Sequence, residues 1–241
     1  MQRNPEEERF VAQTAEKPLV GIIMGSNIGT TLTAWLLSLT GIESSNVFLT
    51  MLKPSTFSPI LALIGIVLYM FCKSEKKKEL GSILLGFSTL MFGMEAMSSA
   101  VSPLAQDEHF TGILTAFSNP ILGMAAGALL TAVIQSSSAS VGILQALAAS
   151  GQVTVGAAVP IIMGQNIGTC ITAMLSSVGA SRNARRAALV HLLFNLTGAG
   201  VWLAVFWLVK VLAAPTMLAR PVTLPGVAVI HTAFNLLCTM L

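Results

Sequence analysis

Long apolar segments separated by short polar connections make up most of this chain of 241 residues. Residues 19–39, 80–101 and 187–212 are apolar over the length of about 20 residues that a helix needs to cross a bilayer. Residues 57–72 form a shorter apolar segment, and a last one follows Pro225. The pattern predicts an all-α, polytopic membrane protein.

Two further apolar segments are too short to cross a bilayer as helices. They cover residues 121–134 and 153–163, and a polar run follows each of them. Asn119-Pro120 is typical of a helix start, because Pro fits the first turn, and Gly151-Gln152 favours a turn. We expect the two segments to be half-helices or the arms of re-entrant hairpins.

Composition and charge support a multi-pass protein of the cell membrane, plasma or inner. Hydrophobic residues make up 54% of the chain and charged residues only 10%, whereas soluble proteins have about 25% charged residues. The basic clusters Lys73–Lys78 and Arg182–Arg186 adjoin apolar segments, which predicts that the connection around residues 73–79 is cytoplasmic. No aromatic residues alternate with these clusters, so the pattern argues against nucleic-acid binding.

A short internal repeat links two distant parts of the chain. Residues 22–41 and 161–180 align at an offset of 139 residues, and eight of the first nine positions are identical. Both copies contain Gly-x-Asn-Ile-Gly-Thr. Internal repeats in a polytopic membrane protein are typical of secondary transporters, in which the substrate site lies where the two halves meet.

The repeat predicts an uneven division of the chain. We interpret residues 1–18 as a polar N-terminal tail and 19–41 as the remnant of a first repeat. Residues 57–101 are expected to form two transmembrane helices with the basic loop between them, and 118–241 the second repeat. The counterpart of Gln135 would lie ahead of Met1, so the first copy lacks its front part.

The candidate chemistry lies in a stretch without charged residues. From Thr111 to Ser181 there is no Asp, Glu, Lys or Arg, yet Gln135-Ser136-Ser137-Ser138 interrupts the apolar sequence. Unpaired polar groups cost several kcal/mol in lipid, so these side chains should face protein, water or a ligand.

Glycines bracket the Asn residues of both repeat copies, and glycine permits an unwound backbone. We therefore expect breaks at Gly25–Gly29 and Gly164–Gly168, with carbonyl oxygens free for a cation and amide groups aimed at an anion. Without a Lys or Arg nearby, a bound anion would need a co-bound cation. This reasoning predicts coupling to sodium.

The motifs together resemble those of the sodium-dependent inorganic phosphate cotransporter family, the type II group with its bacterial relatives. The resemblance rests on Gln-Ser-Ser-Ser, on the repeated Gly-x-Asn-Ile-Gly-Thr and on His-x-x-Phe-Asn at His191 and His231. It implies sodium-coupled transport of inorganic phosphate by inverted repeats, with sodium held by side-chain and backbone oxygens of the same residues and no other cofactor. The binding residues that it implies are Gln135, Ser136, Ser137, Ser138, Asn166, Gly168, Thr169, Asn27, Gly29, Thr30 and Thr31.

The chain departs from the family pattern in ways that leave alternatives open. Cys170 stands where the first copy has Thr31, the first Gln-Ser-Ser-Ser is absent, and no His-x-x-Phe-Asn follows the first Gly-x-Asn segment. The chain could therefore be a partial transporter, inactive alone, that needs a missing repeat segment or a homo-oligomer. A different class is an intramembrane serine hydrolase, with a nucleophile among Ser136–Ser138 and His191 as base.

Overall fold

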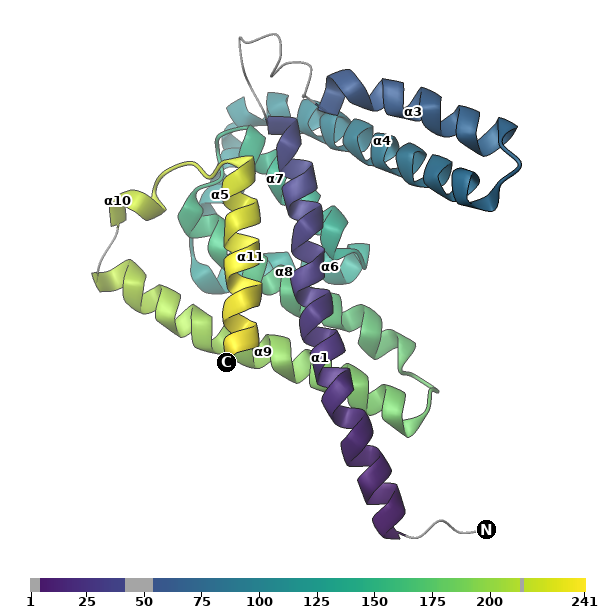
Figure 1. The fold of residues 1–241 in the computed structure, drawn as a ribbon. Coiled ribbons are helices and arrows are strands. Elements are labelled where there is room, and N and C mark those ends of the chain that lie inside the picture. Colours follow the sequence, from purple (N-terminus) through teal and green to yellow (C-terminus); the bar gives the residue numbers. More distant parts are fainter. Residues whose placement is uncertain (1–4, 42–53, 213–214) are drawn as a thin grey trace.

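Helices form nearly all of the described protein. The computed structural model describes residues 5–41, 54–212 and 215–241, and within these ranges its extended structure is limited to an isolated bridge between Thr154 and Pro221. Figure 1 shows helices crossing one another at steep angles rather than lying in a parallel bundle. The predicted all-α class is confirmed.

The helices follow the apolar segments of the sequence. In chain order they are α1 (Pro5–Ser38), η1 (Leu39–Gly41), α3 (Pro54–Phe71), α4 (Glu75–Val101), η2 (Ser102–Gln106), α5 (Glu108–Ala116), α6 (Pro120–Ile134), α7 (Ser137–Ala149), α8 (Val155–Ser176), α9 (Arg182–Leu212), α10 (Pro215–Leu218) and α11 (Leu224–Met240). Helix α1 thus begins within the stretch interpreted as a polar tail. Within the described ranges, four segments are long and apolar enough to cross a membrane: Gly21–Gly41, Glu75–Val101, Val155–Ser176 and Arg182–Leu212. The chain is a multi-pass membrane protein.

Helix α8 lies at the centre of the fold and packs against α6, α7, α9 and α11. Its contact with α6 depends on small residues. A Cβ atom on Gly168 would lie 2.5 Å from the Ala128 carbonyl oxygen, and Gly164 meets the Met124 backbone in the same way. Glycine at these positions lets the two helix backbones approach closely, as in many membrane helix pairs.

Helices α3 and α4 form a hairpin that projects from the rest of the molecule (Figure 1). Gly65 and Gly81 bring the two backbones together, and the Ser88 hydroxyl donates a hydrogen bond of 2.8 Å to the Ser58 carbonyl. Many of the large apolar side chains on α3 point outward and are exposed, such as Leu63, which is the arrangement expected beside lipid.

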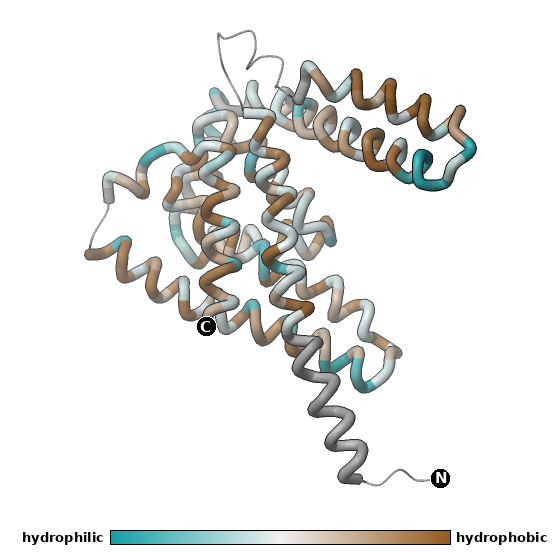
Figure 2. Tube along the Cα trace, in the orientation of Figure 1, coloured by the Kyte–Doolittle hydropathy of each residue, from teal (hydrophilic) through white to brown (hydrophobic). Residues whose placement is uncertain are grey.

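The two basic connections lie toward the same side of the molecule. Figure 2 shows hydrophilic residues at the α3–α4 connection and again at the α8–α9 connection, both at the right of the view. The positive-inside rule places such connections together on the cytoplasmic side. The arrangement of the helices agrees with that expectation.

Candidate functional site

A helix break occupies the Gln-Ser-Ser-Ser run. Helix α6 begins at Pro120 after the cap Asn119, as predicted, and ends at Ile134. Gln135 takes the left-handed conformation with φ 58° and ψ 24°, and its N–H donates to the Thr131 carbonyl. Ser136 is extended and caps α7, because its hydroxyl accepts a hydrogen bond from the Ala139 N–H at 3.2 Å. The first short helix therefore ends where the sequence predicted.

The N-terminal turn of α7 presents unused donors. Among the described residues, no hydrogen bond involves the backbone N–H groups or the hydroxyls of Ser137 and Ser138, and both side chains are only half-buried. The first N–H groups of a helix have no partner within the helix and lie at the positive end of its dipole. This turn can therefore accept an oxyanion.

Residues outside the predicted set hold the break against α8. Gln165 donates from Nε2 to the Ser140 carbonyl at 2.9 Å, and the Thr131 hydroxyl donates to the Ser140 hydroxyl at 2.7 Å. All three side chains are buried, and Oε1 of Gln165 is buried without a hydrogen-bond partner. One signal in the sequence points to Gln165: it stands where the first copy has Ser26, inside an otherwise identical repeat segment.

The repeated Asn segments do not unwind, which corrects the sequence prediction. Helix α1 runs unbroken through Asn27 and Gly29, and α8 through Asn166 and Gly168, so the predicted segment 153–163 belongs from Val155 onward to a full helix rather than to a half-helix. In α8 the glycines allow α6 to pack closely against the helix and do not break it. The predicted Thr hydroxyls bond carbonyls one turn earlier in their own helices: Thr30 to Asn27, Thr31 to Ile28 and Thr169 to Asn166.

Helix α9 connects the two copies of the repeated segment. Nδ2 of Asn27 donates to Oδ1 of Asn195 at 3.3 Å, and both side chains are buried. On the other side, the Cys170 thiol lies 3.5 Å from the His191 carbonyl, which also accepts from Nδ2 of Asn195. Asn195 was not among the predicted binding residues, although it lies in the repeated His-x-x-Phe-Asn pattern.

The two His-x-x-Phe-Asn segments occupy corresponding positions on α9 and α11. In both, the Asn side chain donates to the carbonyl of the His four residues earlier. The two helices touch at Gly198 and Cys238, each three residues after its Asn: a Cβ on Gly198 would lie 2.5 Å from the Cys238 sulfur. Helix α9 packs on α8, and α11 packs on α1. The helix with His-x-x-Phe-Asn that packs on the first repeat copy therefore comes from the end of the chain.

The predicted site residues fall into two groups around α8 and α9. Gln135 to Ser138 lie at the break, which Ser140 and Gln165 join to α8. Asn27 reaches Asn195, and Asn166 lies on α8 one turn before Cys170. Within the described residues, no hydrogen bond joins Gln135–Ser138 to α1, although α7 contacts α1 further along, where Nε2 of Gln145 donates to the Ala34 carbonyl at 2.9 Å.

A multi-pass helical bundle with a broken helix at a charge-free polar run has the architecture of a secondary transporter. The chain belongs to the Na+/Pi-cotransporter family, whose pattern matches residues 15–99 and 89–219. The family comprises transporters and not enzymes, so the serine-hydrolase alternative is not retained.

Relatives of known name agree with this membership. The candidate inorganic phosphate export protein YjbB of Escherichia coli K12 is 31% identical over 192 residues, which cover 78% of this chain and 33% of YjbB. The human sodium-dependent phosphate transport protein 2B is 46% identical over 100 residues, or 39% of this chain and 14% of that protein. The chain thus spans about a third of the length of YjbB. No solved structure gives a significant match.

Proposed function

We propose that this chain carries inorganic phosphate across the cell membrane, taking it in or exporting it, and that sodium drives the transport. The observation that carries the proposal is the helix break at Gln135–Ser136, which leaves two backbone N–H groups and two Ser hydroxyls without partners in a charge-free region. Phosphate is bound well by such a helix start. The names of YjbB and of transport protein 2B concern phosphate, which supports this choice of anion.

Sodium coupling follows from the charge balance at the break. No Lys or Arg occurs from Thr111 to Ser181. The stretch of chain around α7 therefore contains no basic side chain to balance the charge of a bound phosphate. A co-bound sodium ion reduces the cost of holding the anion, and the anion does the same for sodium. Because the backbone carbonyls of Asn27 and Asn166 already accept from Thr hydroxyls, side-chain oxygens are the more available ligands.

The proposed site combines the break with the two repeat copies. Helix α1 with α11 and helix α8 with α9 are equivalent pairs in this proposal, related by a two-fold axis near the contact of Gly198 and Cys238. The packing of α1 on α11 and of α8 on α9 supports an inverted repeat, in which the α6–α7 break forms a re-entrant hairpin. Substrate and sodium then bind between the pairs, near Ser137 and Asn27.

Flux measurements in proteoliposomes test this function. We expect labelled phosphate to move when a sodium gradient is imposed and to slow when potassium replaces sodium. The variant Ser137→Ala should lower the flux, whereas Ser82→Ala, an exposed serine on α4, should not. Phosphate flux that is independent of sodium would contradict the coupling, and equal flux in both variants would contradict the site.

A second candidate is that the chain is one part of a transporter and inactive alone. Gly25 and Gly29 on α1 correspond to Gly164 and Gly168, where α6 packs closely, yet no atom of the described residues lies within 4 Å of the positions where their Cβ atoms would be. A helix similar to α6 would fit on this face of α1. The chain's coverage of only 33% of YjbB is compatible with such an additional segment.

The two candidates are separated by adding the proposed segment. A version of the chain extended at its N-terminus by a helical hairpin with Gln-Ser-Ser-Ser is reconstituted beside the chain itself. Transport by the extended version alone favours the second candidate, whereas equal transport by both favours the first. The variant Gly29→Leu blocks close helix approach and should abolish transport only in the extended version.

A further inference from the structure

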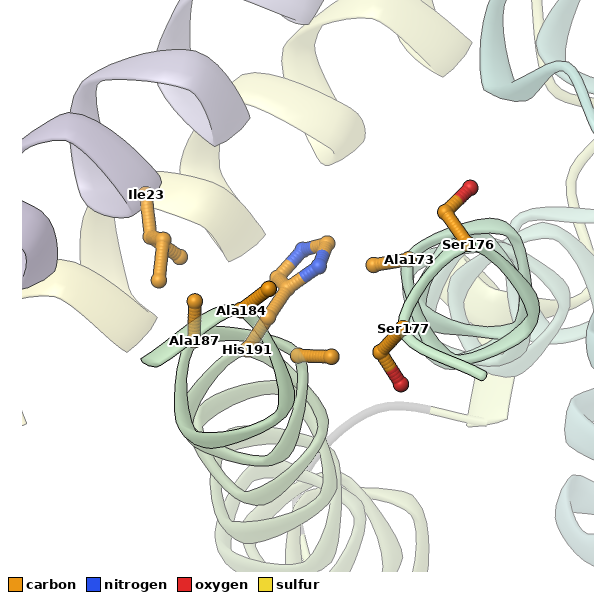
Figure 3. A pocket seen from close by; sticks show the side chains of 8 residues that line it. Ile23, Ala173, Ser176, Ser177, Ala184, Ala187 and His191 are labelled. Carbon is orange, nitrogen blue, oxygen red and sulfur yellow. The ribbon is translucent and has the colours of Figure 1, made fainter. Parts of the chain in front are cut away.

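A pocket of about 290 Å³ lies where α1, α8 and α9 meet. Ile23 contributes from α1, and Ala173 and Ser177 contribute from the C-terminal part of α8. Figure 3 shows the His191 ring of α9 pointing into the space between Ile23 and Ala173. With a molecular share of about 30 Å³ per water in the liquid, the pocket has room for a small ion and several waters.

The pocket lies one helical turn from the buried Asn pair. On α1, Ile23 precedes Asn27 by four residues, and on α9, His191 precedes Asn195 by four residues, so each pocket residue shares a helix face with the Asn that follows it. Asn27 and Asn195 are joined by a hydrogen bond of 3.3 Å. The pocket therefore lies next to the polar contact between the first repeat copy and α9.

The His191 ring is available to a ligand. No hydrogen bond to either ring nitrogen is found among the described residues, and the ring is not fully buried. A neutral imidazole presents one N–H donor and one acceptor. The ring is thus a polar group on an otherwise largely apolar wall that includes Ala184, Ala187 and Ala188.

Two arginines close in sequence to a pocket residue, neither of which lines the pocket, favour anions in this region. Arg182 and Arg185 are exposed on the first turns of α9, beside the pocket residue Ala184. The positive end of the α9 dipole lies close to the negative end of α8 at Ser176, so the two dipoles partly offset each other. The arginines therefore supply the net positive field, which raises the local concentration of anions.

We propose that this pocket is a second binding site for the transported oxyanion, in which the His191 ring donates a hydrogen bond to phosphate before the anion passes the Asn27–Asn195 pair. The proposal rests on phosphate being the substrate. It gives the basic side of the protein a holding site that is separate from the break at Gln135–Ser138. His191 touches the substrate there and acts as a binding residue.

Protection of an introduced thiol tests the pocket directly. In a Cys72→Ser background, whose remaining thiols Cys170 and Cys238 are buried, Ala187→Cys is labelled with an anionic methanethiosulfonate. Inorganic phosphate at ten times its dissociation constant fills about nine-tenths of the sites and should slow the labelling about tenfold. The matched control is Val178→Cys on the α8–α9 connection, which is 80% exposed, does not line the pocket and should label at the same rate with and without phosphate.

A second variant assigns the protection to His191. Adding His191→Ala should raise the phosphate concentration for half-protection about tenfold, as expected for a lost hydrogen bond to a charged group. The buried thiol Cys238 should stay unlabelled in this variant, which shows that it is folded. The proposal is overturned if phosphate does not slow the labelling of Ala187→Cys. It is also overturned if His191→Ala leaves the protection by phosphate unchanged.

Flux in the same proteoliposomes separates the two proposals. Phosphate flux without protection of Ala187→Cys overturns the pocket and leaves the transport function standing. Protection without flux supports the pocket and contradicts transport by this chain alone.

Discussion

The contact between α6 and α8 gives a prediction with an internal control. Gly168 on α8 and Gly29 on α1 occupy the same position in the repeat, but within the part of the chain that the structure describes another helix covers Gly168 and none covers Gly29. A Cβ atom at residue 168 would lie 2.5 Å from the Ala128 carbonyl oxygen and 2.6 Å from Cβ of Thr131, whereas nothing lies within 4 Å of one at residue 29. Gly168→Ala should therefore destabilise the protein, and Gly29→Ala should not.

The expected size follows from the distances. Ordinary van der Waals contact begins at 3.4 Å, so the methyl group of Gly168→Ala forces the helices apart by about 0.9 Å locally. The obstacle is backbone, which has no alternative rotamer. Overpacking of this kind costs about 1–3 kcal/mol, and the better helix propensity of Ala returns at most about 1 kcal/mol. With the full propensity gain subtracted, the net loss should be up to about 2 kcal/mol for Gly168→Ala, against no change or a gain of up to about 1 kcal/mol for Gly29→Ala.

Thermal unfolding in detergent micelles, followed by tryptophan fluorescence, measures the difference. A loss of 1 kcal/mol lowers the Tm of a chain of this size by about 2–4 °C, so the two variants should differ clearly. Gly164→Ala and Gly25→Ala form a second matched pair at the preceding turn. The reasoning is refuted if Gly168→Ala is as stable as the parent, or if Gly29→Ala is equally damaging in the chain alone.

Three other predictions concern polar residues. Gln135→Gly should raise stability by up to about 1 kcal/mol, because glycine adopts the left-handed conformation without strain. The same variant should lower phosphate flux, because the side-chain amide is lost. A lower stability than that of the parent would contradict the first expectation. Gln145 donates from Nε2 to the carbonyls of Ala34 and Leu224, so Gln145→Ala should cost about 1–3 kcal/mol, and a chemical denaturation curve that matches the parent would show these contacts to be unimportant. A double-mutant cycle of Asn27→Ala and Asn195→Ala should give a coupling of about 0.6 kcal/mol, the average for membrane hydrogen bonds, and additive effects would mean that the bond at 3.3 Å contributes nothing.

Local features of the fold could be predicted because they depend on residues close in sequence. The length of an apolar run determines whether a helix can span lipid, and α9 extends over the predicted segment. Asn119-Pro120 starts α6 because the Asn side chain accepts from the N–H groups of Ile121 and Leu122. The break at Gln135 was predictable for the same reason: consecutive polar side chains cannot continue an apolar helix facing lipid.

The role of the glycines could not be predicted, because it depends on which helix lies beside them. Glycine permits both an unwound backbone and close helix packing, and the residues around Gly168 and Gly29 are nearly identical. Only the position of α6 separates the two cases. The roles of Gln165 and Ser140 could not be predicted for the same reason, because their hydrogen bond joins residues 25 positions apart in the sequence.

The pairing of helices far apart in the chain changes how the repeat is understood. From sequence, the first Gly-x-Asn copy lacks its His-x-x-Phe-Asn companion because none follows it directly. In the structure α11 packs against α1, and the Trp35 indole donates to the Thr232 hydroxyl at 3.0 Å. Asn27, which precedes Trp35 by two turns, is thereby held where it meets Asn195. Among the described residues, no atom lies within 4 Å of a Cβ built on Gly25 or Gly29, and this is the face of α1 on which an additional helix similar to α6 is proposed to pack.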